Sequence, residues 1–191
     1  MTTRVILVSP ASSEALRQAR FDADSPLDAA GIRRARSAAD ALPAATRTAV
    51  SPGVRCRQTA DALGLSAVPD AALAGCAMGR WHGRTLDEVS AAEPAEVAAW
   101  LADPACAPHG GESLLTLCGR AGDWLAAAAR QEGRVIAVAE PDVVRAAVVR
   151  ALGLPEQLFW RIDVPPLTAV ELSGRAGRWN LRAGRPLGGA G

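Results

Sequence analysis

The chain has 191 residues, with 21 basic and 20 acidic side chains, so its formal net charge at pH 7 is +1. An even balance creates no long-range field that would attract nucleic acid or an anionic membrane, and we expect neither as a partner. The apolar share of 49% argues against a disordered chain and is sufficient for one hydrophobic core.

Few residues are of the types that form a His/Cys zinc site. Four cysteines show no Cys-x-x-Cys spacing and only two histidines are present, so we expect reduced thiols, no metal and no cofactor. No apolar run approaches the roughly 18 residues that a membrane-spanning helix needs, and the first residues lack a signal-peptide pattern. These features predict a cytoplasmic protein.

Strand and helix patterns alternate along the chain. Continuous apolar runs at residues 5–8 and 135–138 are typical of strands buried on both faces. The remaining predicted elements are a strand at 46–50, helices near 28–42, 54–63, 92–102, 113–130 and 145–152, a capping box from Thr85 to Glu88, and a hairpin joining 169–172 to 178–181. This order predicts a three-layer α/β fold with a mainly parallel central sheet and helices on both faces.

We expect one domain over residues 1–184, followed by a flexible Gly/Pro-rich tail at residues 185–191. In an open parallel sheet, a ligand binds beyond the carboxyl ends of the strands. The segments that follow the predicted strands are residues 9–11, 51–55 and 140–141. These segments are therefore predicted to surround the functional site.

Five segments resemble motifs of the histidine phosphatase (phosphoglycerate-mutase-like) superfamily, in the same order along the chain. They are residues 25–31 (SPLDAAG), 51–60 (SPGVRCRQTA), 79–88 (GRWHGRTLDE), 110–113 (GGES), and 143–145 with 152–155 (VVR and LGLP). The resemblance covers nearly the whole chain, and it implies the same phosphoglycerate-mutase-like α/β fold.

The differences from the family pattern fall on its catalytic positions. The family has Arg-His-Gly after its first strand, with the histidine as phosphoryl acceptor, where this chain has Ser9, Pro10 and Ala11. By the same resemblance, Glu140 occupies the place of a second histidine and Gly75 that of the catalytic acid. Arg55 is retained.

These differences favour a degenerate member without normal phosphatase or mutase activity: a pseudoenzyme that binds a small anionic ligand or a protein partner. One alternative is a repurposed enzyme in which Arg55 anchors an anion and Glu140 is a general base for acid–base or lyase-type chemistry. A second alternative is a residual phosphatase. Arg55 and Glu140 are the candidate catalytic residues, although a purely structural ion pair would look the same in sequence.

The other residues expected at the pocket have weaker support. His109 is a possible acid or base on a loop over the pocket mouth, with an exposed, uninvolved histidine as the alternative. The stripe of Trp100, Leu101, Trp124 and Leu125 is interpreted as core between helices. The expected pocket or ligand-binding residues are Ser9, Pro10, Ala11, Arg20, Gly75, His109 and Ser113.

Overall fold

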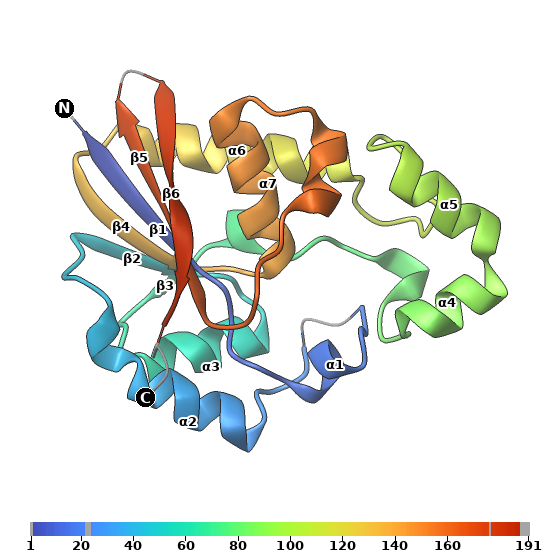
Figure 1. Cartoon of the computed structure of the whole chain (residues 1–191), viewed down its shortest axis with the longest axis horizontal. Helices are drawn as coiled ribbons and strands as arrows, with labels where there is room; N and C mark the ends of the chain where they lie inside the picture. Colours follow the sequence, from blue (N-terminus) through green and yellow to red (C-terminus); the bar gives the residue numbers. More distant parts are fainter. Residues whose placement is uncertain (1, 22–23, 176, 188–191) are drawn as a thin grey trace.

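The computed structural model describes residues 2–21, 24–175 and 177–187, which form a six-stranded sheet with helices around it (Figure 1). The strands lie in the order β3-β2-β4-β1-β5-β6. Their bounds are β1 Thr3–Val8, β2 Arg47–Val50, β3 Val68–Pro69, β4 Gly133–Val138, β5 Thr168–Arg175 and β6 Arg178–Pro186. The first four are parallel, whereas β5 runs antiparallel to β1 and β6 antiparallel to β5. The predicted α/β class with a mainly parallel sheet is confirmed.

Helices cover both faces of this sheet. In Figure 1, α2 and α3 lie below the sheet and α6 and α7 above it, while α4 and α5 extend to one side. The α-helices are α1 Glu14–Arg17, α2 Ala29–Ser37, α3 Val54–Ala62, α4 Leu86–Ala92, α5 Pro94–Ala102, α6 Leu114–Ala129 and α7 Pro141–Leu152. The short 3-10 helices are η1 Ala39–Ala41, η2 Ala71–Leu73, η3 Gly79–Trp81 and η4 Glu156–Arg161.

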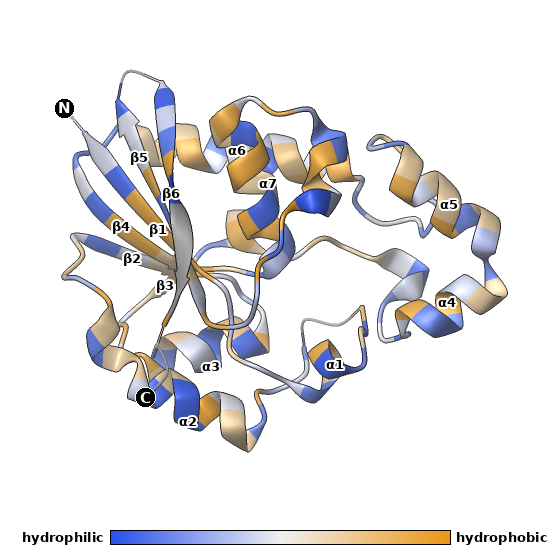
Figure 2. Ribbon diagram, in the orientation of Figure 1, coloured by the Kyte–Doolittle hydropathy of each residue, from blue (hydrophilic) through white to orange (hydrophobic). Residues whose placement is uncertain are grey.

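The alternation of side chains along the central strands divides the core into two layers. Val5 and Leu7 of β1 pack in the cluster that includes α6 and α7, whereas Ile6 and Val8 pack with α2 and α3. Figure 2 shows the hydrophobic residues along β1 and β4. Burial on both faces explains why these strands are continuous apolar runs in the sequence.

Local signals set several helix ends. The capping box predicted from Thr85 to Glu88 is present at the start of α4. Helix α7 starts at Pro141, directly after β4, and ends at Gly153, whose φ of 63° is the left-handed conformation that favours glycine. Because only Ala139 and Glu140 separate β4 from α7, the residues at this junction are held firmly at the end of the sheet.

The C-terminal hairpin is longer than the pattern predicts. Strand β6 continues to Pro186, two residues past the expected domain end, and the N–H of Leu187 donates to the carbonyl of Leu167. Leu187 is fully buried, whereas residues 188–191 of the expected tail lie outside the described residues. Among the described residues, no helix is both long and apolar enough to cross a membrane.

Candidate active site

The parallel strands bring Arg55 and Glu140 together at the carboxyl ends of β2 and β4. Arg55 lies in the first turn of α3, five residues after the end of β2, and Glu140 lies between β4 and α7. The Nη2 of Arg55 is 2.6 Å from the Oε2 of Glu140, and its Nε donates to the same oxygen at 2.7 Å. Residues 85 positions apart in the chain therefore form an ion pair with a charge-assisted hydrogen bond.

The two oxygens of Glu140 have different partners. Oε2 accepts from Arg55, while Oε1 accepts from the thiol of Cys56, at 3.3 Å. Glu140 is 1% exposed, and burial raises its pKa to about 7, even though the charge of Arg55 and both hydrogen bonds lower it. The carboxyl group can consequently gain or lose a proton near neutral pH.

Asp142 is the second residue of α7 and lies beside this pair. Its Oδ2 accepts from the backbone N–H of Cys76 at 2.6 Å and its Oδ1 from its neighbour Val143 at 2.7 Å. Burial raises the pKa of Asp142, and its charge in turn contributes to the raised pKa of Glu140. Both oxygens are occupied by backbone donors, which fixes the orientation of the carboxylate.

Gly75 lies against the same carboxylate. A Cβ atom at this position would be 3.2 Å from Cγ of Glu140 and 3.7 Å from Oδ2 of Asp142. The contact with Glu140 would be tighter than ordinary van der Waals packing, whereas the contact with Asp142 would be an ordinary one. Glycine here thus leaves room for the Glu140 side chain to reach Arg55.

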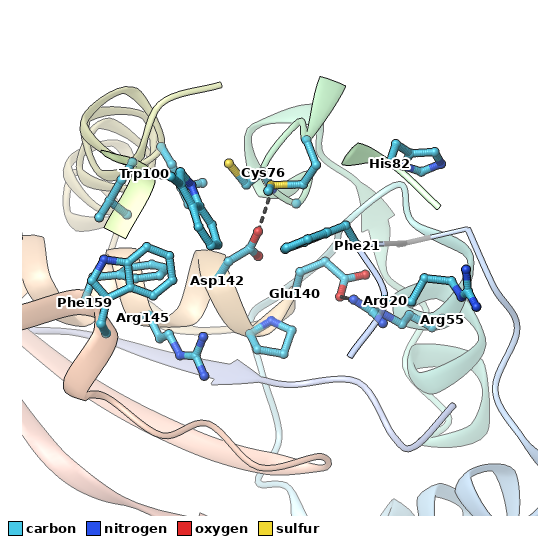
Figure 3. A pocket seen from close by; sticks show the side chains of 16 residues that line it. Arg20, Phe21, Arg55, Cys76, His82, Trp100, Glu140, Asp142, Arg145 and Phe159 are labelled. Carbon is cyan, nitrogen blue, oxygen red and sulfur yellow. Dashed lines mark hydrogen bonds and ion pairs between the residues drawn. The ribbon is translucent and has the colours of Figure 1, made fainter. Parts of the chain in front are cut away.

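A cavity of about 250 Å³ opens beside these residues (Figure 3). Three arginines line it, each from a different segment: Arg20 after α1, Arg55 on α3 and Arg145 on α7. The complete lining is Arg20, Phe21, Arg55, Gly75, Cys76, Met78, His82, Trp100, Leu114, Leu117, Glu140, Pro141, Asp142, Arg145, Phe159 and Trp160. The cavity therefore combines a charged end with an aromatic end.

The arginines differ in how many of their N–H groups already donate hydrogen bonds to other parts of the protein. Arg20 donates to the side chain of Gln18 and to the carbonyl of Gly83. Arg145 donates through Nε to the carbonyl of Ile162 at 2.7 Å, and within the described residues its terminal nitrogens have no hydrogen-bond partner. Arg145 therefore retains two NH₂ groups that are free to bind an anion.

Four of the expected site residues, Arg20, Arg55, Gly75 and Glu140, line this one cavity. Ser9, Pro10 and Ala11 are buried and are not among its lining residues. The hydroxyl of Ser9 donates to the carbonyl of Pro165 at 2.7 Å and accepts from the N–H of Thr168 at 2.9 Å. These contacts tie the first strand to the segment that leads into β5, and they leave Ser9 no free donor for a ligand.

Two further expected residues also lie away from the cavity wall. Ser113 is the N-cap of α6 and accepts from the N–H of Thr116. His109 is neither exposed nor at the pocket mouth, because it is 1% exposed and its ring lies 5.0 Å from that of Trp81. Its Nδ1 accepts from Gly111, and burial lowers its pKa. The imidazole is a packed, neutral part of the aromatic cluster.

Sequence reasoning missed the aromatic side of the cavity. Trp100 does not share a core with Trp124, as the stripe interpretation predicts, but lines the cavity beside Trp160 at a ring distance of 4.6 Å. Trp124 lies outside this lining and donates to Asp70. Leu125 is buried in the main core, whereas Leu101 is 47% exposed.

The chain is similar in sequence or in structure to several known phosphatases. A glucosyl-3-phosphoglycerate phosphatase of Mycolicibacterium vanbaalenii is 36% identical over 89 residues, which span 41% of this chain and 39% of that protein. A solved mycobacterial glucosyl-3-phosphoglycerate phosphatase in complex with VO3 superposes with a TM-score of 0.83 at 26% identity, over 94% of this chain and 96% of that one. A phosphoserine phosphatase mutant from Entamoeba histolytica, bound to phosphoserine, shares the fold at 16% identity, with a TM-score of 0.86 over 95% and 96% of the two chains.

These similarities contradict the pseudoenzyme prediction. The relative at 36% identity and the solved structure at 26% are both described as phosphatases. The prediction was based on the residues that replace the family's histidines, and it gave too little weight to the rest of the site. Arg55, Arg20 and Arg145 still present guanidinium groups to one cavity.

Family membership follows from how much of the chain a family model matches. The model of the histidine phosphatase superfamily (branch 1) matches residues 11–184, which include strands β2 to β5, most of β6 and the seven α-helices of the described residues. The chain belongs to the histidine phosphatase superfamily (branch 1).

Proposed function

We propose that this protein hydrolyses a small phosphomonoester in the cavity beside Arg55 and Glu140. The observation that carries the proposal is the convergence of Arg20, Arg55 and Arg145 on one cavity at the carboxyl ends of the parallel strands. The planar guanidinium group matches the geometry of a phosphate dianion, and three of them exceed the charge of the two carboxylates, Glu140 and Asp142. The phosphatases to which the chain is similar support the same assignment.

The chemistry must proceed without a histidine in the two positions that the family resemblance indicates, since these hold Pro10 and Glu140. We assign the attack to a water molecule. The thiol of Cys76 is a poor alternative nucleophile, because burial raises its pKa far above the ordinary value and keeps it protonated.

Glu140 acts as the proton donor in this scheme. With a pKa of about 7, a large part of its population is protonated at neutral pH, and an incoming dianion favours the protonated form further. Protonation removes the like-charge repulsion that an ionised Glu140 would exert on the substrate. Arg55, released from the carboxylate charge, is then available to the phosphate.

The bonds and protons balance as follows in a single displacement. The water oxygen forms a bond to phosphorus while the bond from phosphorus to the ester oxygen breaks. The proton of Glu140 passes to the departing oxygen, giving a neutral alcohol, and the attacking water gives one proton to a phosphoryl oxygen. Solvent reprotonates Glu140 after the products leave. The arginines stabilise the charge on the phosphoryl oxygens during transfer.

The direct test measures release of inorganic phosphate by the purified protein from a panel of phosphomonoesters between pH 5 and 9. Because Glu140 must be protonated, we expect kcat/KM to fall as pH rises through about 7. Glu140→Gln should lower kcat by about a hundredfold or more, since an amide cannot donate the proton in an acid step.

Asp123→Asn is the matched control, because Asp123 is an exposed carboxylate on α6 outside the cavity lining. It should retain full activity. The proposal is wrong if no ester of the panel yields phosphate above the uncatalysed rate, or if Glu140→Gln hydrolyses the same esters as fast as the unmodified protein.

A further inference from the structure

We infer that the preferred substrate carries a planar aromatic group next to its phosphate, so that the cavity selects aromatic over polyol or aliphatic phosphomonoesters. This inference rests on the proposed function where it is tested by turnover. Its second test measures binding alone. It concerns the aromatic side of the cavity, which is formed by Phe21, Trp100, Phe159 and Trp160. In Figure 3, Trp100 and Phe159 lie at the end away from Arg20 and Arg55, and Phe21 lies between the two ends.

The aromatic rings come from three separate parts of the chain. Phe21 follows α1, Trp100 lies on α5, and Phe159 and Trp160 lie on η4. Phe21, Trp100 and Trp160 are only partly buried, although large apolar side chains outside a ligand site are usually packed inside. Their remaining exposure includes the surface that they present to the cavity.

The rings are held in place by the packing behind them. Fully buried Trp81 stacks on Phe21 at a ring distance of 5.7 Å and meets Trp100 edge-to-face at 5.5 Å. The indole N–H of Trp81 donates to Glu93 at 3.0 Å, which fixes its own orientation. The aromatic wall is thus preorganised, and a ligand ring need not order it on binding.

Several edge-to-face contacts already exist within this wall. Trp100 meets Trp160 at 4.6 Å with an interplanar angle of 71°, and it meets Phe21 at 5.8 Å with an angle of 85°. Aromatic rings favour such T-shaped and offset arrangements because the ring edge is positive and the ring face negative. A planar ring in the cavity can extend the same pattern, whereas a saturated ring of similar size gains only the burial of its surface.

Arg145 joins the two ends of the cavity. Its guanidinium carbon lies 5.7 Å from the centre of the Phe159 ring, and its terminal nitrogens have no partner in the described part of the chain. An anion bound to these nitrogens would lie next to the aromatic wall. A phosphate group and a ring attached to it through one or two atoms can therefore contact Arg145 and Trp100 together.

The wall offers little to a polyhydroxylated group. Phe21, Trp100, Phe159, Trp160, Met78, Leu114 and Leu117 contribute no carboxylate, amide or hydroxyl to this end of the cavity. A sugar or glycerate moiety placed here would find only the indole N–H donors of Trp100 and Trp160 among these side chains, so most of its hydrogen bonds to water would be lost, which costs affinity for each unpaired group. The cavity should consequently discriminate against such substrates.

The test compares two esters with saturated carbon next to the ester oxygen, so that the leaving groups are similar. These are benzyl phosphate and cyclohexylmethyl phosphate. We expect kcat/KM to be about threefold to tenfold higher for the benzyl ester, which is the free energy of one aromatic pair expressed as a ratio. Binding of benzylphosphonate and cyclohexylmethylphosphonate, measured by calorimetry, should show the same ratio without any turnover.

Trp100→Leu and Trp160→Leu each remove one ring, from different elements, and should bring the ratio close to one. Trp124→Leu is the control, because Trp124 is a partly buried tryptophan outside the cavity lining. It should leave the ratio unchanged. Two cavity variants are needed since either one alone could disturb folding, which the melting temperature reports.

The outcomes separate this inference from the proposed function. Equal kcat/KM for the two esters overturns the inference while leaving phosphatase activity established. Absence of turnover together with tighter binding of benzylphosphonate supports the inference and refutes the proposed function. Equal or undetectable binding of both phosphonates without turnover overturns the inference as well, and so does a preference that survives in both Trp100→Leu and Trp160→Leu.

Discussion

The Nε of Arg55 donates a hydrogen bond to one oxygen of Glu140 at 2.7 Å, and its Nη2 lies 2.6 Å from the same oxygen as an ion pair, whereas the other carboxylate oxygen accepts from the thiol of Cys56. A guanidinium group that serves both oxygens would hold the carboxylate more firmly in its charged form. With this arrangement, burial outweighs the ion pair and the pKa of Glu140 rises to about 7. The pair is therefore sensitive to pH in the neutral range.

The first prediction concerns the stability of the fold. The pKa of Glu140 is raised from an ordinary value of 4.5 to about 7, so the folded state holds this proton more tightly than the unfolded state. The resulting stabilisation is complete below about pH 4.5 and is lost as pH rises through 7. We expect the free energy of unfolding to fall by up to about 3 kcal/mol from this group between pH 5 and 8.

Glu140→Gln should remove most of this slope, because an amide does not ionise. The measurement is urea unfolding at pH 5, 6, 7 and 8 for both proteins. Asp142, whose pKa burial also raises, contributes a slope of the same sign, so some pH dependence should remain. Asp123→Asn, at an exposed site, should follow the unmodified protein. An identical slope in Glu140→Gln and the unmodified protein would contradict a raised pKa at this position.

The second prediction concerns Arg55→Met. The charge of Arg55 lowers the pKa of Glu140, so its removal should move that pKa above 7. The side-chain carboxyl ¹³C signal of Glu140 reports the titration directly. Phosphate release should also fall by about a hundredfold, by analogy with the loss of one preorganised donor to a transition-state oxyanion.

Arg57→Met is the matched control for this change. Arg57 is an exposed arginine on the same helix, two residues further along, and it is not part of the cavity lining. Its replacement should leave both the Glu140 titration and the activity unchanged. A Glu140 pKa that stays constant or falls in Arg55→Met would show that the ion pair does not determine the protonation of the carboxyl.

The Arg55–Glu140 pairing could be predicted from sequence because it depends only on topology. Both residues follow parallel strands, and the carboxyl ends of such strands meet at one edge of the sheet. The aromatic wall could not be predicted in this way. Phe21, Trp100 and Trp160 are far apart in the chain and show no periodic pattern, so only the packing around Trp81 brings them together.

Two other errors have similar physical causes. His109 precedes two glycines, a pattern typical of an exposed loop, yet this segment packs against η3 and buries the ring. The expected tail was inferred from its glycine and proline content. Pro186 nevertheless ends strand β6 at the edge of the sheet, where a missing backbone N–H is tolerated.

The third prediction concerns Gly75→Ala. The added methyl group would lie 3.2 Å from Cγ of Glu140, so the carboxylate must shift away from Arg55 by a few tenths of an ångström. We expect a folded protein with kcat reduced severalfold, because proton transfer depends closely on the donor position. Gly119→Ala on α6 is the control, since a Cβ there meets nothing within 4 Å.

Gly119→Ala should retain full activity and gain about 0.5–1 kcal/mol of stability, as alanine is the better helix former. Circular dichroism melting curves and phosphate-release assays of both variants supply the comparison. Full activity in Gly75→Ala would mean that the position of Glu140 relative to Arg55 has little effect on turnover.

The last prediction concerns the C-terminal end of the sheet. Strand β6 pairs with β5 as far as Pro186, and Leu187 is fully buried against the core with its N–H bonded to Leu167. A chain that ends at residue 184 loses the last strand pairs and this leucine, whereas a chain that ends at 187 keeps every described contact. We expect the free energy of unfolding of the shorter chain to be about 2–5 kcal/mol lower, which is the range measured when a buried leucine is replaced by alanine.

Leu187→Ala in the full chain distinguishes the stability that comes from the Leu187 side chain from the stability that comes from the strand pairing. It should account for most of the loss, because Pro186 has no N–H to donate and the remaining backbone pairs lie at an edge. Urea unfolding of the two truncated chains and of Leu187→Ala, each against the full chain, gives the three free energies. Equal stability of the chains ending at 184 and 187 would mean that the domain closes before Leu187, as the Gly/Pro content of the segment first indicated.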